Sequence, residues 1–191
     1  MTVTYFENEL YDKVDYSLQN PPEGEYDNCS FTNCIFSNIF ISKTNFNKCS
    51  FTGCDFSNIK FNNIGLKDVL FIECKLLGVH FNYCNPILFQ AEFSKCNLNF
   101  SSFYKLKLKK AKFSDNAMNE VDFSECDLTA ATFKNCDLTK AIFDQSILEK
   151  ADFRSAYNFS INPEKNRVKK AKFSLEGAVG LLNTYDLDIE G

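Results

Sequence analysis

The sequence lacks tryptophan and contains one histidine, four prolines and only seven glycines among its 191 residues. The glycines form no phosphate-binding loop, and the lone histidine, His80, has no acidic partner with which to build a Ser-His-Asp arrangement. No stretch approaches 18 consecutive apolar residues, which excludes a membrane-spanning helix. The first residues, MTVTYFENEL, lack a basic region followed by an apolar run, so no signal peptide is visible.

Phenylalanine and cysteine are abundant instead, with 21 and nine copies. The chain is 24% charged and its mean hydropathy is −0.26, so the aromatic content does not reflect a membrane protein and argues against disorder. An odd number of cysteines without a secretion signal indicates reduced thiols, as in the cytoplasm. The length fits one domain.

Large apolar residues recur at every fifth position over most of the chain. Twelve such positions follow one another over residues 26–81, and after a slip of two residues fourteen more run over 88–153; all 26 are apolar. Seventeen of the 21 phenylalanines lie in this register when Phe6 and Phe173 are counted. A helix repeats near 3.6 residues and a strand near 2, so a period of five needs a turn in every repeat. The chain is therefore predicted to wind around an axis.

The position two residues before most repeat centres holds a smaller apolar residue. All nine cysteines obey this rule; Cys29, for example, precedes Phe31, and Cys84 holds the same slot in the register of the first run. We interpret the centre and this position as inward-facing, and the three remaining, mostly polar positions as solvated. Cysteine pairs such as Cys49 and Cys54 are spaced more widely than zinc ligands usually are. We expect a core of reduced thiols and no metal.

The pentapeptides ADFRS (151–155), CDLTK (136–140) and CSFTN (29–33) resemble those of the pentapeptide-repeat proteins. The resemblance covers about residues 24–155 and implies an all-β, right-handed quadrilateral β-helix with four pentapeptides in each coil of 20 residues. Coils stacked about 4.8 Å apart would form a rod of roughly 30 Å. If a bulge absorbs the slip, one stacked column should contain Phe31, Phe51, Phe71, Phe93, Phe113, Phe133 and Phe153.

We divide the chain into three parts. Residues 1–25 are expected to form an N-terminal cap, because Pro21-Pro22 interrupts a weak register. Residues 26–155 form the solenoid, with the slip at about 82–87. Residues 156–191 form a C-terminal loop, a short helix and a tail.

The C-terminal helix is expected to have Ser174 as its N-cap and one apolar stripe, made of Leu175, Ala178, Val179 and Leu182. This helix either folds back over the last coil or pairs with a two-fold mate. The family resemblance favours pairing, because similar C-terminal segments form homodimers. Leu175, Val179 and Leu182 are then the candidate dimer interface.

Charge is unevenly distributed along the chain. Residues 1–28 carry a net charge of −6, residues 29–154 carry +2 and residues 155–191 carry 0. The length, the single central slip, the segment NFSINPE (158–164) and the short hydrophobic tail resemble the quinolone-resistance (Qnr) and microcin B17 immunity subgroup. That resemblance implies binding to DNA gyrase or topoisomerase IV through an acidic rod that imitates duplex DNA. Here the acidic N-terminal segment would have to contribute to such binding, since no column of the solenoid is strongly acidic.

Two outward features interrupt the polar surface. The first is a basic cluster, which is either a solvated surface or a contact for nucleic acid or an acidic protein face; it contains Lys105, Lys107, Lys109, Lys110 and Lys112. The second is a set of apolar residues in slots that are usually polar, namely Leu77, Tyr83, Phe89, Phe100 and Tyr104. Either the central bulge covers these residues or they form a binding site. We expect a partner site beside the bulge, made of Leu77, His80, Tyr83, Phe100, Tyr104 and Lys105.

These patterns predict a non-enzymatic, dimeric protein that acts by binding another macromolecule, without a cofactor and without contact with a membrane. The mild net charge of −4 argues against direct binding of nucleic acid. The resemblance implies a protein partner, a type II topoisomerase, and protection of that enzyme from quinolones or a peptide toxin. The alternative is a general protein-interaction scaffold with no role at a topoisomerase.

Overall fold

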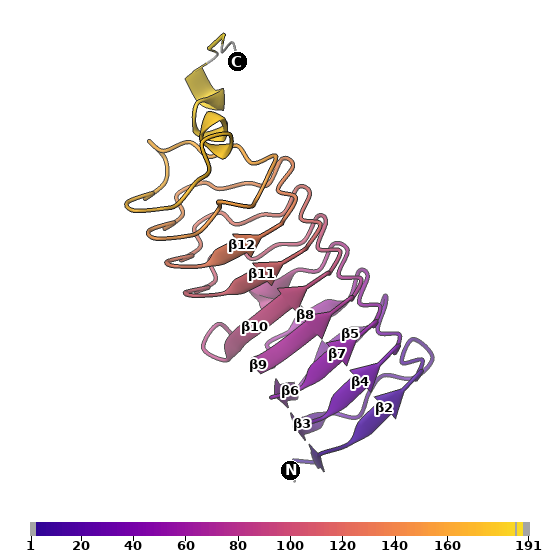
Figure 1. Cartoon of the computed structure of the whole chain (residues 1–191). Helices are drawn as coiled ribbons and strands as arrows, with labels where there is room; N and C mark the ends of the chain where they lie inside the picture. Colours follow the sequence, from indigo (N-terminus) through magenta and orange to yellow (C-terminus); the bar gives the residue numbers. More distant parts are fainter. Residues whose placement is uncertain (1–2, 186, 189–191) are drawn as a thin grey trace.

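A computed structural model describes residues 3–185 and 187–188 of the chain. The chain winds into a rod of stacked coils, with its two ends at opposite ends of the rod (Figure 1). Its strands are β1 (Tyr5–Glu7), β2 (Leu10–Asp12), β3 (Gly24–Asp27), β4 (Ser30–Thr32), β5 (Phe40–Ser42), β6 (Thr44–Asn47), β7 (Ser50–Thr52), β8 (Lys60–Asn62), β9 (Gly65–Ile72), β10 (Phe89–Ser94), β11 (Lys112–Ser114) and β12 (Thr132–Lys134). Three 3-10 turns accompany them: η1 (Phe81–Tyr83), η2 (Gly177–Leu181) and η3 (Asn183–Tyr185).

Every strand pair is parallel and joins residues one coil apart. β1 pairs with β3 through Tyr5 and Glu25, and β3 pairs with β6 through Glu25 and Asn45, an offset of 20 residues in both pairs. A ten-stranded sheet contains the order β1-β3-β6-β9-β10-β11-β12, and β5 and β8 form a second sheet. Isolated bridges continue the same pairing on the other sides and toward the C-terminus. The right-handed quadrilateral β-helix that the family resemblance implies is confirmed, as is the winding predicted from the five-residue period.

Four columns of inward side chains define four faces of the rod, which we number along the chain. Face 1 covers the column that begins with Phe6, Tyr26, Phe46 and Leu66, and face 2 covers the column from Tyr11 to Phe173. Face 3 covers the column of Tyr16, Phe36, Phe56 and Leu76, and face 4 covers the column of Ile41, Phe61, Phe81 and Phe103. Each column continues in the later coils. The predicted column of phenylalanines lies under face 2, and stacked neighbours at its ends add Tyr11 and Phe173. Ring centroids along this column lie 4.6 to 5.5 Å apart, near the spacing of adjacent strands.

The inward position two residues before the repeat centre links each coil to the one before it. The Cys49 thiol donates to the Tyr26 carbonyl at 3.4 Å. Where this position is polar, the same bond persists: the Ser146 hydroxyl donates to the Phe123 carbonyl at 2.8 Å, and the Asn116 amide donates to the Phe93 carbonyl at 3.0 Å. All nine cysteines are free and buried. Burial raises the pKa of Cys49 and of Cys126 to about 12, so both thiols stay protonated at neutral pH.

Most corners of the rod turn on one residue with a positive φ angle. Most of these residues stand two positions after the repeat centre, and most are not glycine; Asn33 has a φ of 52° and Lys48 has the same value. The N–H of most corner residues donates to the next coil, as Asn33 does to the Thr52 carbonyl at 2.8 Å. Because asparagine tolerates the left-handed region and this hydrogen bond holds most corners, the fold needs few glycines.

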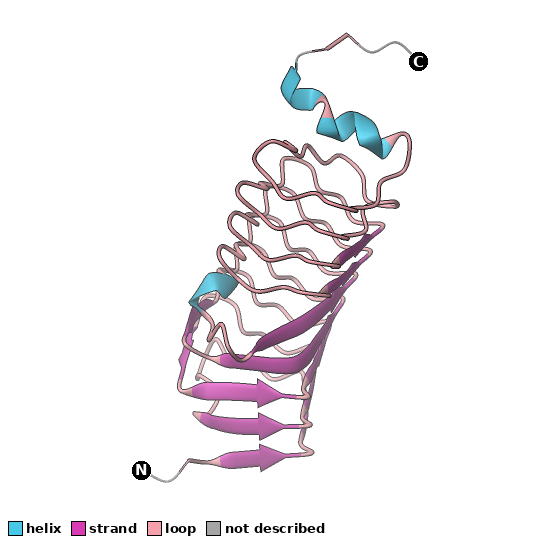
Figure 2. Cartoon of the chain, turned by 90° about the vertical axis from the view of Figure 1, so that its left-hand side faces the viewer, coloured by secondary structure: helices cyan, strands magenta, loops and turns pink. Residues whose placement is uncertain are grey.

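The two-residue slip lies where the sequence indicates it, but it changes which side chain faces inward. The offset rises to 23 residues at Leu66 and Phe89, then settles at 22 residues at Val69 and Ala91. η1 lies at the margin of the solenoid beside this irregularity (Figure 2). Two expectations are wrong here: Phe89, predicted to face outward, is 8% exposed in the core, and Leu88, predicted to be a centre, is only half-buried. The other 25 predicted centres are buried.

The solenoid register extends into both terminal segments. Within residues 1–25, Phe6 stacks on Tyr26 at 4.5 Å and Tyr16 stacks on Phe36 at 4.7 Å. Beyond residue 155, Arg167 bridges to Ile147 and Lys172 bridges to Asp152. Both segments therefore contribute strands or bridges to the rod.

The expected C-terminal helix is present only as two 3-10 turns, η2 and η3. The Ser174 hydroxyl oxygen accepts a hydrogen bond from the Gly177 N–H at 2.9 Å, but Ser174 is not the N-cap of η2, which begins at Gly177 with Glu176 as its N-cap residue. Gly180 lies against Phe159, and a Cβ at Gly180 would stand 2.4 Å from the Phe159 carbonyl oxygen. The close approach of the backbone to this ring fixes the turn on the last coil.

Candidate binding surfaces

The residues predicted as a partner site lie across face 4 and its two corners, and we call them the aromatic face. Phe100 and Leu77 lie on the corner between faces 3 and 4, His80 lies on face 4, and Tyr83, Tyr104 and Lys105 lie toward face 1. Tyr83 is 61% exposed and Phe100 is 54% exposed, whereas Leu77 and Tyr104 are half-buried. The slip therefore leaves these two aromatic rings uncovered and covers only Phe89.

Three contacts hold parts of the aromatic face together. The rings of His80 and Tyr83 lie 5.9 Å apart, beside and within η1. In the next coil the Lys105 ammonium lies 4.7 Å from the centre of the Tyr104 ring, a cation–π distance. Leu77 and Phe100 are neighbours through the corner, because the Gly78 N–H donates to the Asn99 carbonyl at 2.9 Å.

Glu125 anchors the Tyr104 and Lys105 end of the surface. The Tyr104 hydroxyl donates to Glu125 Oε1 at 2.8 Å, and Lys105 Nζ lies 3.4 Å from Glu125 Oε2. Hydrogen bonding to Tyr104 and the negative charge of Glu125 raise the pKa of the Lys105 amine. A cation, an aromatic ring and a carboxylate thus form one preorganised group at the surface.

Phe100 occupies a corner position that disfavours a bulky side chain. Its φ is 61°, as at Glu120 (55°) and Lys140 (54°) in the same row. A bulky residue in the left-handed region is an outlier, and more than half of the Phe100 ring is exposed. The fold does not need this ring, and local conformation opposes it. That combination is typical of a residue retained for a contact outside the chain.

The basic cluster divides into paired and unpaired lysines. Lys109 lies 3.3 Å from Asp127, and Lys112 lies 2.8 Å from Glu92. Within the part of the chain that the structure describes, Lys107 and Lys110 form no ion pair. Because their side chains leave the rod on three faces, the five lysines of this cluster do not make one site by themselves.

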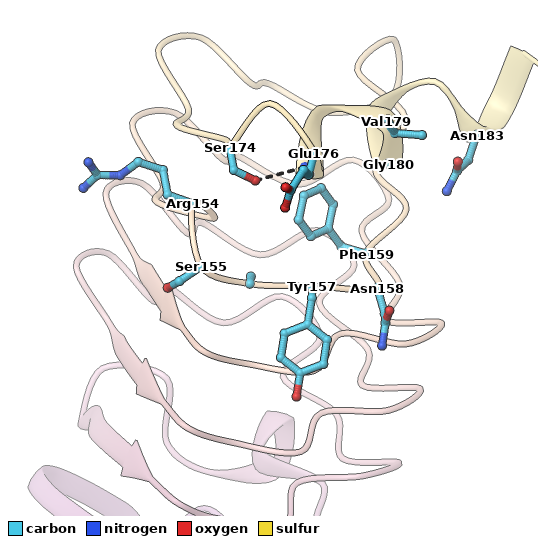
Figure 3. A pocket seen from close by; sticks show the side chains of 12 residues that line it. Arg154, Ser155, Tyr157, Asn158, Phe159, Ser174, Glu176, Val179, Gly180 and Asn183 are labelled. Carbon is cyan, nitrogen blue, oxygen red and sulfur yellow. Dashed lines mark hydrogen bonds between the residues drawn. The ribbon is translucent and has the colours of Figure 1, made fainter. Parts of the chain in front are cut away.

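A cleft of about 420 Å³ separates the last coil from the C-terminal turns (Figure 3). The Phe159 ring points toward η2, and Tyr157 projects from the coil beneath it (Figure 3). Tyr157 is 50% exposed, whereas Phe159 is buried. Our sequence reasoning did not identify this cleft; the signal was the pair of glycines, Gly177 and Gly180, three residues apart.

The candidate dimer residues all lie on the outside of the tail. Leu175 is 92% exposed, Val179 is 43% exposed and Leu182 is 39% exposed. A 3-10 turn repeats every three residues, so Val179 and Leu182 share one row, while Gly177 and Gly180 share the row against Phe159. The predicted apolar stripe is therefore divided: Leu181, not Leu182, packs against the core.

Metal-binding groups and membrane-spanning helices are the last features to consider. In residues 3–185 and 187–188, no three His, Cys, Asp or Glu side chains are grouped so that they could hold a metal ion. Across the same residues, no helix has the length and apolar character needed to cross a membrane.

Comparison with known proteins identifies the repeat. The sequence matches the pentapeptide repeat region over residues 25–86, 44–123 and 86–157, which together cover more than half of the chain. No curated protein sequence matches it.

Three solved structures resemble the chain at low identity. QnrB1, a plasmid-mediated fluoroquinolone resistance protein, is 18% identical, with a TM-score of 0.48 over 96% of this chain and 100% of that one. HetL, involved in heterocyst differentiation regulation in the cyanobacterium Nostoc sp. strain PCC 7120, is 15% identical, with a TM-score of 0.32 over 91% and 85%. Rfr23, from the cyanobacterium Cyanothece 51142, is 19% identical, with a TM-score of 0.20 over 44% and 60%. On the extent of the sequence match, the chain belongs to the pentapeptide repeat family.

Proposed function

We propose that the protein is a non-catalytic binding protein whose aromatic face docks onto a protein partner. The observation that carries this proposal is Phe100, an exposed aromatic side chain in a backbone conformation that disfavours it. Binding energy at protein interfaces concentrates in aromatic and arginine side chains with polar groups around them. Tyr83 and Tyr104 supply further aromatic area, and Lys105 and Glu125 supply the polar rim.

The partner we propose is a type II topoisomerase, DNA gyrase, which the protein would protect from quinolones or from a peptide toxin. The support is the sequence resemblance to the Qnr and microcin B17 immunity subgroup. QnrB1 is a plasmid-mediated fluoroquinolone resistance protein. In the structure, the NFSINPE segment buries Phe159 and Ile161, and the Ile161 N–H donates to the Gly180 carbonyl at 3.0 Å. This segment thus positions the C-terminal tail, not the aromatic face.

The distribution of charge indicates which parts of the protein would attract and contact gyrase. A rod that imitates DNA needs acidic columns, whereas here the net negative charge is concentrated in residues 1–28, which carry −6. Attraction to a DNA-binding enzyme would come from that end, and the aromatic face would supply the short-range contact. We therefore expect salt to weaken the association without abolishing it.

The deciding experiment is gyrase supercoiling in the presence of ciprofloxacin. The purified protein should restore supercoiling, and the double variant Phe100→Ala plus Tyr104→Ala should lose most of this effect while staying folded. Lys140→Ala, at the same corner two coils later, is the matched control and should protect as the parent does. If the parent neither rescues nor inhibits gyrase at micromolar concentration, the topoisomerase proposal is wrong.

The second candidate is a general protein-interaction scaffold. The same aromatic face favours it, since nothing in that surface is specific to gyrase. The scaffold would be supported by two results together. The wild-type protein does not affect gyrase, and it captures another protein that the double variant Phe100→Ala plus Tyr104→Ala does not capture. Unchanged partner binding by that variant would eliminate the aromatic face from both candidates.

We also propose that the protein is a homodimer joined by its C-terminal tail in a reducing compartment, the cytoplasm. Exposed Leu175, Val179 and Leu182 lie on a turn that Phe159 and Gly180 hold against the rod. Buried, free thiols fit the compartment. Leu182→Arg should give a monomer by light scattering, with Leu18→Arg, on an exposed leucine at the opposite end, as the control. A dimer that persists in Leu182→Arg excludes the tail as the interface.

A further inference from the structure

Stacking brings distant basic residues into one surface that the linear sequence does not reveal. On the corner between faces 1 and 2, Lys110, Lys150 and Lys170 occupy one row, with Ala130 at the intervening coil. All four residues have a φ between 57° and 60°, so they hold equivalent positions. We call this row, with the outward residues of faces 1 and 2 in the same four coils, the basic corner. Its charged members are Lys107, Lys109, Lys110, Lys112, Asp115, Asp127, Lys134, Glu149, Lys150, Asp152, Arg154, Arg167, Lys169, Lys170 and Lys172.

The basic corner carries a large excess of positive charge. Eleven of its side chains are lysine or arginine, all exposed, against four carboxylates, of which only Asp115 is fully exposed. The remaining acids are already occupied: Arg167 lies 2.7 Å from Glu149, and Arg154 lies 2.7 Å from Asp152. Hydrogen bonding from Arg154 holds the pKa of the Asp152 carboxyl below its usual value, so this pairing persists over a wide pH range.

Three of the unpaired cations stand on the corner itself, and three stand on the two faces beside it. In the described part of the chain, six lysines of the basic corner form no ion pair: Lys107, Lys110, Lys134, Lys150, Lys169 and Lys170. Neighbouring coils are about 4.8 Å apart, so the four coils extend about 15 Å along the rod. Duplex DNA presents one charge for about every 1.7 Å of its axis. Several phosphates therefore fall within reach of the row at once.

A hollow beside the row offers uncharged hydrogen-bond donors. On face 2, a groove of about 480 Å³ is lined by two lysines, an arginine, an aspartate and three hydroxyl side chains, namely Lys112, Ser114, Thr132, Lys134, Asp152, Arg154 and Ser155. Lysine, arginine, serine and threonine are the side chains that commonly contact phosphate and sugar in nucleic-acid complexes. The groove thus adds hydroxyl donors to the charge of the corner.

The composition of the surface favours nucleic acid over an acidic protein. Up to Lys172 its outward positions contain no aromatic residue, and Ile147, which is half-buried, is the one large apolar residue among them. Exposed Leu175 follows at the end of the last coil, where the C-terminal turns begin. Protein interfaces have an apolar, aromatic-rich centre, whereas protein–DNA interfaces are polar and strongly positive. Single strands are held largely by stacking on aromatic rings, which this surface lacks. The aromatic face, by contrast, has the composition of a protein interface.

We propose that the basic corner binds the sugar-phosphate backbone of duplex DNA without sequence preference. The expectation of no direct nucleic-acid binding came from the net charge of the whole chain, −4. That total hides a segregation: residues 1–28 carry a net charge of −6, whereas the basic corner has eleven lysine and arginine side chains against four carboxylates. The proposal is independent of the partner of the aromatic face.

The test is fluorescence anisotropy with a labelled duplex of random sequence, in a salt series that begins at about 50 mM. The parent should bind, and log Kd should vary linearly with log salt. The variant Lys110→Gln/Lys150→Gln/Lys170→Gln should bind at least tenfold more weakly, and its salt slope should fall by about 3, because each phosphate contact contributes about 0.9. Lys48→Gln, at the same corner with a φ of 52° but near the acidic end, should bind as the parent does.

Ala130 provides a test that removes no native side-chain contact. Ala130→Lys completes the row and should tighten binding and raise the salt slope by about 0.9, whereas Ala130→Glu should weaken binding. Absent duplex binding by the parent, or equal binding by the triple variant, would overturn the proposal. So would polyglutamate of matched charge binding as tightly as the duplex, which would assign the surface to an acidic protein.

Discussion

Replacing Phe100 with asparagine should leave the protein as stable as before, or more stable, while weakening its binding to a protein partner. Most substitutions of a phenylalanine in this chain should do the opposite, because most rings are buried in a column. Phe100 differs because it stands at a corner with a φ of 61° and is 54% exposed. Asparagine tolerates this backbone conformation and already occupies the equivalent corner positions 38 and 58.

The expected size follows from two opposing contributions. The left-handed region costs an ordinary residue about 1–2 kcal/mol, much of which asparagine avoids. Removing the ring loses the part that is buried, slightly less than half of a phenylalanine, or about 1 kcal/mol. The net change in the free energy of unfolding is then between zero and a gain of about 1 kcal/mol. For a chain of this length that gain raises Tm by about 2–4 °C.

Binding should change in the other direction. An aromatic hot spot contributes about 2 kcal/mol or more, so Kd for the partner should rise about thirtyfold. Thermal and denaturant unfolding measure the first effect, and titration against gyrase, the first partner to test, measures the second. Lys140→Asn, at a corner with a φ of 54° and without a ring, is the control and should leave binding unchanged. A loss of stability above 1 kcal/mol would show that the Phe100 ring supports the fold, and an unchanged Kd would refute its role in binding.

Three further predictions concern the core and the tail. Phe113→Ala removes one ring from the continuous column and should cost about 3–5 kcal/mol of unfolding free energy, measured by denaturant titration; a cost below 1 kcal/mol would contradict the packing described for face 2. The thiols of Cys49 and Cys126, whose pKa burial raises to about 12, should resist maleimide at pH 7 to 8 in the native state and react once the protein unfolds; rapid native labelling would show that the coils open. Gly180→Ala places a Cβ against the Phe159 carbonyl and should loosen the C-terminal turns. Proteolysis of the tail should then be faster than in the parent, and cleavage at the parent's rate would contradict this prediction.

The buried side chains of this protein could be predicted from the sequence because the five-residue repeat that specifies them is local. A period of five residues specifies which side chains face inward, and parallel stacking at constant offset brings like residues together without further information. The column under face 2 and the burial of every cysteine follow from that rule. It fails at Leu88 and Phe89, where three inserted residues and a compensating bulge rotate the chain, a local geometry that periodicity does not encode.

The surface depends on residues one or more coils apart, and therefore on the tertiary structure. The row of Lys110, Lys150 and Lys170 exists because those residues hold equivalent positions at one corner in three of four successive coils, with Ala130 in the fourth. The net charge of the whole chain does not reveal this row. The C-terminal segment adopts 3-10 turns because Gly177 and Gly180 rest on Phe159, which the apolar stripe alone did not indicate. The sequence by itself determined the coil, its core and its reduced thiols. Only the stacking decided which outward aromatic rings stay exposed and where positive charge accumulates, since both depend on neighbours 20 to 23 residues away.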